Sequence, residues 1–137
     1  MKRQVSFYSF LGGKKMNVII NGKEFSFVFG YGFLKAINDE TKIEASGITL
    51  NMGIANVVSS IKTGDVEGLI DVLQKANKTE TPKLTSQDIE HLFDEHDAAD
   101  LFDLVLEELK KSQFTKTATQ RILVEMQNNQ TKHTQEQ

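Results

Sequence analysis

The chain contains 137 residues, of which 39% are hydrophobic and 26% are charged, as is usual for one globular domain. Its formal net charge of −3 argues against general nucleic-acid binding, which requires a basic surface. Because cysteine is absent, disulfides and thiolate sites are excluded. No apolar run is long enough to cross a membrane. The composition therefore predicts a single domain whose partners are neither nucleic acids nor membranes.

The first fifteen residues have two interpretations. Codons for Gly12-Gly13-Lys14-Lys15-Met16 can contain GGAGG, a bacterial ribosome-binding sequence, a few bases before ATG. Residues 1–15 would then be a leader or a mis-annotated start, and the protein would begin at Met16. The alternative is an additional strand within residues 1–10, because the segment VSFYSF alternates in polarity. The sequence favours the leader over the strand.

Asn21-Gly22 predicts the turn of a β-hairpin. A type I′ turn needs positive φ at both central residues, and Asn-Gly adopts this conformation readily. If these two residues form the loop, Ile20 pairs with Lys23 across the turn. One face of the hairpin is then entirely apolar, with the side chains of Met16, Val18, Ile20, Phe25 and Phe27. We expect other elements to cover this face.

Helical periodicity dominates the rest of the chain. After a bend at Gly30-Tyr31-Gly32, Phe33 begins a helix and joins Phe29 and the hairpin phenylalanines in the predicted core. The polar segment 39–49 predicts a loop, which can include a short extended piece at 47–50. The predicted helices lie around residues 33–37, 54–61, 66–73, 86–93, 98–111 and 114–126.

Caps and helix breakers mark the ends of these helices. Gly64 suits the left-handed position that follows a helix, and Asp65 can cap the next one. Pro82 blocks helix formation in the loop that follows. Thr85 or Ser86 can then cap the helix after this loop.

These elements predict a mainly helical α+β fold, in which an N-terminal β-hairpin packs on about five α-helices. The single globular domain is expected to span residues 16–126. Residues 127–137 contain no apolar side chain and are predicted to form a disordered polar tail.

Candidate catalytic and metal-binding residues are few. His91 and His96 stand five positions apart, so they face different sides of a helix and do not match a zinc-binding pair. Gly30-Tyr31-Gly32 lacks the glycine spacing of a nucleotide-binding loop, and no serine stands in a nucleophile motif. The sequence therefore predicts no catalytic residue, no metal and no cofactor, and we do not expect an enzyme.

An acidic region extends from residue 88 to residue 108, with nine carboxylates and no lysine or arginine. Such a run is most often a solvent-exposed face. The alternative is a surface for a basic or amphipathic helical partner, which is favoured by apolar side chains in excess of one buried stripe. The candidate partner-binding residues are Asp100, Phe102, Asp103, Leu106 and Glu107.

Residues 18–35 resemble a known family. This segment reads VIINGKEFSFVFGYGFLK and is similar to the N-terminus of tail assembly chaperones from siphophages and prophages of Gram-positive bacteria. The later layout is also similar, with NMGI at 51–54, TGD at 63–65, PKLTSQDI at 82–89 and LFDLVLEELKKS at 101–112. The resemblance covers residues 16–126.

The resemblance implies a binding protein. It implies that the chain binds and solubilises the tape-measure protein of a phage tail and helps to recruit tail-tube subunits during tail assembly. It also implies that the chain acts in the cytoplasm of the bacterial host and is absent from the mature virion. A coating protein of this kind can form a homo-oligomer, and many copies along one partner gain avidity from modest contacts.

Two other classes of function fit the same residues. A structural virion protein, such as a connector or a tail-completion protein, would remain in the finished particle. A small regulatory protein of a mobile element would use its acidic face on a basic DNA-binding protein. Analysis of purified virions separates the first class from a chaperone, and binding to a basic repressor would favour the second.

Overall fold

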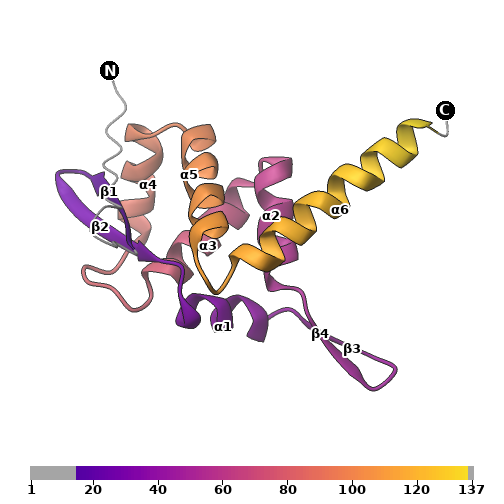
Figure 1. Cartoon of the computed structure of the whole chain (residues 1–137). Helices are drawn as coiled ribbons and strands as arrows, with labels where there is room; N and C mark the ends of the chain where they lie inside the picture. The colour runs from indigo at the N-terminus through magenta and orange to yellow at the C-terminus, as the bar shows by residue number, and fades with distance from the viewer. Residues whose placement is uncertain (1–14, 136–137) are drawn as a thin grey trace.

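The computed structural model describes residues 15–135, so the leader or strand predicted near the N-terminus lies, apart from Lys15, outside the described residues. The architecture is α+β and mainly helical, as predicted (Figure 1). Within the described range there are six helices and two hairpins. The elements are β1 (Lys15–Ile20), β2 (Lys23–Val28), α1 (Tyr31–Asp39), β3 (Lys42–Ala45), β4 (Ile48–Asn51), α2 (Gly53–Thr63), α3 (Val66–Asn77), α4 (Ser86–Glu95), α5 (Ala98–Lys111) and α6 (Lys116–Gln135).

The β1–β2 hairpin has the predicted register. Asn21 and Gly22 form its turn with φ angles of 51° and 79°, and Ile20 pairs with Lys23. The predicted apolar face is fully buried at Met16, Val18, Ile20, Phe25 and Phe27. Burial of this face specifies the register, because a slip of one residue would turn all of these side chains toward water.

The C-terminal end of α4 holds the turn of this hairpin. Both carboxylate oxygens of Glu95 accept a hydrogen bond from the backbone N–H of Asn21, at 3.0 and 2.9 Å. The buried imidazole of His96 donates from Nε2 to the carbonyl oxygen of Ile19, at 2.8 Å. The turn is therefore tied to α4 through backbone groups, which are costly to leave unpaired when they are buried.

Asn77, at the end of α3, joins three segments of the chain. Its buried side chain donates from Nδ2 to the carbonyl oxygens of Ser26 and Pro82, both at 3.1 Å. Its Oδ1 accepts a hydrogen bond from the backbone N–H of Leu84 at 2.8 Å. One amide thus links strand β2, helix α3 and the loop that leads into α4.

The segment 39–49, predicted as a loop, instead contains most of a second β-hairpin. Strands β3 and β4 pair antiparallel across Ser46 and Gly47, which have φ angles of 53° and 76°. This register places four apolar side chains on one face: Ile43, Ala45, Ile48 and Leu50. Every residue of both strands is exposed, and Figure 1 shows the hairpin projecting from the body. The prediction of a loop was wrong for β3, whereas the short extended piece predicted at 47–50 corresponds to β4. Because the hairpin contributes nothing to the core, its polar composition did not distinguish β3 from a loop.

Helix α2 occupies the centre of the helical layer, in contact with α1, α3, α5 and α6. The β1–β2 hairpin packs on α3 and α4. The last helix, α6, continues to Gln135, beyond residue 126, at which the folded part was predicted to end. No glycine or proline interrupts this stretch, so nothing in the backbone stops the helix. The division of the chain into a leader, a domain and a tail stays a prediction.

Replacing Asn77 by alanine tests the link between the three segments. We expect Asn77→Ala to lower the free energy of unfolding by about 2–4 kcal/mol, because it leaves two carbonyls and one N–H without their partner. Urea denaturation measures this change. Asn56→Ala, at an exposed position of α2, is the matched control and should change stability by less than about 0.5 kcal/mol. Equal effects of the two substitutions would contradict the assigned role.

Threonine substitutions in the second hairpin test whether its apolar face is uncovered. Ile43→Thr and Ile48→Thr retain a β-branched side chain and should each cost less than about 1 kcal/mol, because both side chains are already exposed. The same change at the buried Ile54 should cost at least about 2 kcal/mol, because it buries a hydroxyl. Chemical denaturation measures the free energy of unfolding of all three variants. If Ile48→Thr lowered the free energy of unfolding as much as Ile54→Thr, the apolar face of the second hairpin would be covered.

Candidate partner-binding surfaces

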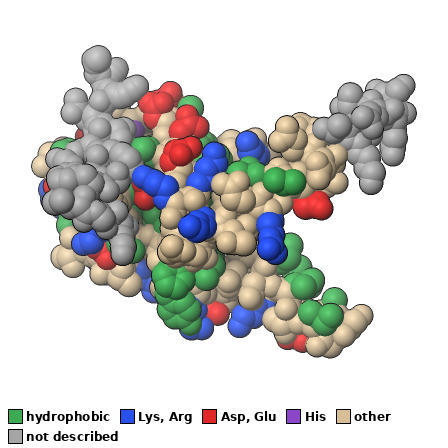
Figure 2. Space-filling model, viewed as in Figure 1, with side chains coloured by type: hydrophobic (Ala, Val, Ile, Leu, Met, Phe, Trp, Pro, Cys, Tyr) green, Lys and Arg blue, Asp and Glu red, His purple; other side chains and the backbone are tan. Residues whose placement is uncertain are grey.

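The acidic region of residues 88–108 is divided between structural and exposed carboxylates. Asp88 caps α4, Glu95 holds the hairpin turn, and Glu108 is buried beside Lys111, at 3.4 Å. Figure 2 shows other Asp and Glu side chains gathered over the junction of α4 and α5. The carboxylates of this region therefore have two roles. Some cap or anchor α4, and others form an exposed acidic surface.

Asp88 forms a reciprocal capping box with Thr85. The carboxylate accepts hydrogen bonds from the backbone N–H and the hydroxyl of Thr85, both at 2.8 Å, and the hydroxyl accepts one from the N–H of Asp88. Burial alone would raise the pKa of Asp88. The hydrogen bonds from Thr85 outweigh this effect and hold the pKa below its ordinary value. Of the two hydroxyls that the sequence offered as caps, Thr85 is the one used.

The five predicted partner-binding residues do not share one environment. Asp103 and Glu107 are exposed and stand one turn apart on α5, and Glu107 lies 3.5 Å from Lys110. Asp100 and Leu106 are half-buried. Phe102 is only 8% exposed and belongs to the hydrophobic core, so it cannot offer a free face to a partner.

The burial of Phe102 has a clear cause. Helix α5 packs against both α2 and α6, so it needs a wider apolar stripe than a helix with one neighbour. Leu101, Val105 and Leu109 form one part of this stripe, and Phe102 forms the other. The apolar excess that suggested a partner surface is therefore used for packing inside the chain. We define the acidic surface as Asp100, Asp103, Leu106 and Glu107.

Two exposed apolar features are absent from the sequence-based predictions. The first is the face of the β3–β4 hairpin, whose three larger side chains are between 46% and 59% exposed. Alternating residues on both sides of Ser46-Gly47 could have indicated it. The second is a pair of aromatic rings, Tyr31 and Phe114, with centroids 6.2 Å apart. No local pattern could have brought these two residues together, because they come from distant parts of the chain.

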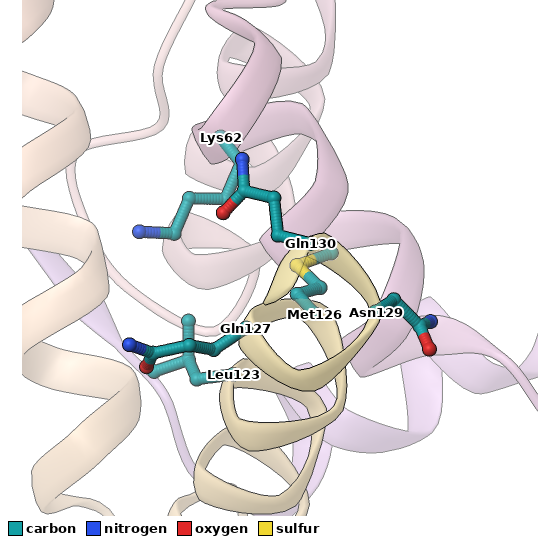
Figure 3. Close-up of a pocket in the computed structure, with 6 residues that line it drawn as sticks. All are labelled: Lys62, Leu123, Met126, Gln127, Asn129 and Gln130. Carbon is teal, nitrogen blue, oxygen red and sulfur yellow. The ribbon is translucent and has the colours of Figure 1, made fainter. Parts of the chain in front are cut away.

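A shallow groove lies between the end of α2 and the middle of α6. Its volume is about 950 Å³, and Lys62 of α2 faces a row of α6 side chains across it (Figure 3). Leu123 and Met126 give the groove apolar lining, and Gln127, Asn129 and Gln130 give it polar lining. The described residues that line the groove include no acid and no histidine, and they suit contact with a partly apolar surface.

The two histidines of α4 and its cap are separated, as their spacing predicts. His91 is half-buried within α4, whereas His96 is used in the bond to Ile19. Among residues 15–135, no three histidine, aspartate or glutamate side chains gather into a group that could hold a metal ion. In the same range, no helix combines the length and the apolar character needed to cross a membrane.

Substitution of Asp88 tests the capping role of this carboxylate. We expect Asp88→Ala to lower the free energy of unfolding by about 1 kcal/mol at pH 7. Because the folded state holds the pKa below its ordinary value of 3.8, the stabilisation is complete above that value and is lost as the pH falls through the lowered pKa. Denaturation curves of both proteins should therefore converge at low pH. Glu90→Ala, at an exposed position of the same helix, should show no such convergence.

Comparison with known protein families assigns the chain. The family model described as phage tail assembly chaperone protein, TAC, matches residues 17–123, from within β1 to within α6. No curated protein and no solved structure matches the chain. The family match confirms the resemblance detected at residues 18–35, although it does not indicate the bacterial host. The chain therefore belongs to the family of phage tail assembly chaperones.

Proposed function

We propose that this chaperone binds the tape-measure protein of its phage and keeps it soluble while the tail is built. The observation that carries the proposal is the uncovered apolar face of the β3–β4 hairpin, on a chain that belongs to a chaperone family. A tape-measure protein is a long helical chain with apolar ridges, and such ridges aggregate unless they are covered. The exposed branched side chains of the hairpin suit that task, because they can pack on an apolar ridge without rearrangement of the core.

The acidic surface supplies a second kind of contact. Asp103 and Glu107 are exposed on α5, where they can pair with basic side chains that flank an apolar ridge. Exposed ion pairs contribute little individually, so contacts of this kind steer association and dissociate readily. Weak contacts suit a chaperone that tail-tube subunits must later displace. Recruitment of these subunits, action in the cytoplasm of a Gram-positive host, and absence from the mature virion all belong to the same proposal.

Many copies on one client strengthen weak contacts. A tape-measure protein is long enough to bind several chaperones, so neighbouring copies act together through avidity. A homo-oligomer formed along the client would raise the effective concentration further. Catalysis has no place in this scheme, in keeping with a family of chaperones rather than of enzymes.

Charge reversal on α5 tests the acidic surface. We expect Asp103→Lys/Glu107→Lys to weaken binding to the co-expressed tape-measure protein about tenfold, since each lost pair contributes up to about 1 kcal/mol and the new lysines repel basic side chains. The measurement is the soluble fraction of the tape-measure protein, followed by the affinity of the purified complex at two salt concentrations. Glu24→Lys/Glu125→Lys changes the net charge equally at exposed positions elsewhere and is the matched control.

The possible results distinguish a failure of the acidic surface from a failure of the proposed function. Unchanged solubility with the α5 variant would reject the acidic surface but not the chaperone. Failure of the unsubstituted chain to raise the soluble fraction of the tape-measure protein would reject the proposed function itself. Detection of the chain in purified virions would instead favour a structural tail protein.

A further inference from the structure

Tyr31 and Phe114 form an exposed aromatic pair. Tyr31 is the first residue of α1 and is 61% exposed, and Phe114 lies in the turn between α5 and α6 and is 52% exposed. Their ring centroids are 6.2 Å apart, with an angle of 56° between the ring planes. All other phenylalanines in residues 15–135 are buried or half-buried. The aromatic rings that this part of the chain leaves in solvent are therefore neighbours in space.

Hydrogen bonds hold the backbone beneath this aromatic pair. The hydroxyl of Ser112 donates to the carbonyl oxygen of Phe29 at 2.6 Å and accepts from the N–H of Phe114 at 3.2 Å. The buried hydroxyl of Thr115 donates to the carbonyl oxygen of Leu109 at 2.7 Å. These contacts fix the α5–α6 turn against the start of α1. An ordered turn thus exposes Phe114 to solvent. Because the turn is already ordered, binding of a partner loses less conformational entropy.

Basic residues are concentrated in the segment of the chain that contains Phe114. Residues 109–124 contain Lys110, Lys111, Lys116 and Arg121 and no carboxylate. Lys116 and Arg121 are exposed, and no described carboxylate pairs with either. Lys35 stands one turn from Tyr31 on α1, so the two residues share a helix face, and its Nζ lies 3.3 Å from a carboxylate oxygen of Asp39. Figure 2 shows Lys and Arg side chains over the lower part of α5 and the start of α6, next to a hydrophobic patch at the start of α1.

We propose that the Tyr31–Phe114 pair and its basic surroundings form a docking site for an acidic protein segment with an apolar side chain at its centre. Interfaces draw much of their binding energy from aromatic side chains, and a rim of opposite charge orients the partner. Lys116 and Arg121, which pair with no carboxylate in residues 15–135, are available to acidic side chains. The site goes beyond the proposed binding of the tape-measure protein, because its charge is opposite to that of the acidic surface. One chaperone can therefore hold two segments of opposite charge at the same time.

A protein segment fits this site better than a nucleic acid. The chain as a whole has a net charge of −3, and Glu107 and Glu108 lie within one turn of Lys110 and Lys111. A phosphate backbone requires a continuous basic track, whereas a short acidic peptide needs only local charge. The small size of the aromatic pair likewise matches one apolar anchor.

The test measures binding of fluorescein-labelled peptides by anisotropy at low salt. The probe carries Glu and Asp on both sides of a single central Phe, and its matched control carries Gln at every acidic position. We expect the acidic probe to bind with a Kd on the order of 100 µM, and the Gln peptide at least about tenfold more weakly. Tyr31→Ala/Phe114→Ala should weaken binding of the acidic probe at least about tenfold, and Lys116→Glu/Arg121→Glu should do the same.

Controls keep the proposal falsifiable. Val124→Ala removes an equally exposed apolar side chain from α6 and should bind the probe as the unsubstituted chain does. Circular dichroism and the unfolding midpoint must be unchanged in the aromatic variant, and Tyr31→Phe/Phe114→Tyr should restore binding if that variant is unstable. Equal binding of both peptides, or undiminished binding by the aromatic variant, would overturn the proposal. So would tighter binding of a single-stranded oligonucleotide, or self-association that the aromatic substitutions abolish.

Discussion

The apolar face of the β1–β2 hairpin packs on α3 and α4, and the remaining elements are arranged around this contact. Its five buried side chains contribute on the order of 10 kcal/mol of hydrophobic free energy, which is comparable with the whole net stability of a small domain. A two-stranded sheet is marginal by itself, so this burial is what makes the hairpin stable. Glu95, His96 and Asn77 form hydrogen bonds with the backbone of the hairpin and hold the ends of α4 and α3 against it.

This arrangement separates scaffold from function. Most residues of the segment 18–35, which most resembles the chaperone family, are buried or bonded to the rest of the chain. Tyr31 and Lys35 at its end are exposed, and the apolar face of the β3–β4 hairpin and the acidic surface lie outside it. The β3–β4 hairpin, the acidic surface of α5 and the aromatic pair all stand on elements that the core holds in place. Substitution at these sites can therefore change binding with little effect on the fold.

The extent to which the fold could be predicted depended on burial. Asn21-Gly22, Gly64, Asp65 and Thr85 produce local signals, and the structure uses each of them as the sequence indicated. Of the β3–β4 hairpin, the sequence predicted only an extended piece at 47–50, because neither face of the hairpin is buried and the alternation of its side chains is weak. The burial of Phe102 was not predicted, because the number of helices that pack on α5 is a property of the tertiary structure. For the same reason, no sequence pattern could pair Tyr31 with Phe114.

Hydrogen exchange of the chaperone, alone and bound to its tape-measure protein, distinguishes the scaffold from the binding surfaces. We expect new protection of backbone amides in residues 42–51, where the strands of the second hairpin are exposed in the free chain, and on the exposed side of α5. We expect little change in strands β1 and β2, whose amides already belong to the buried scaffold. Protection confined to β1 and β2, with none at residues 42–51, would contradict the separation of scaffold and binding surface.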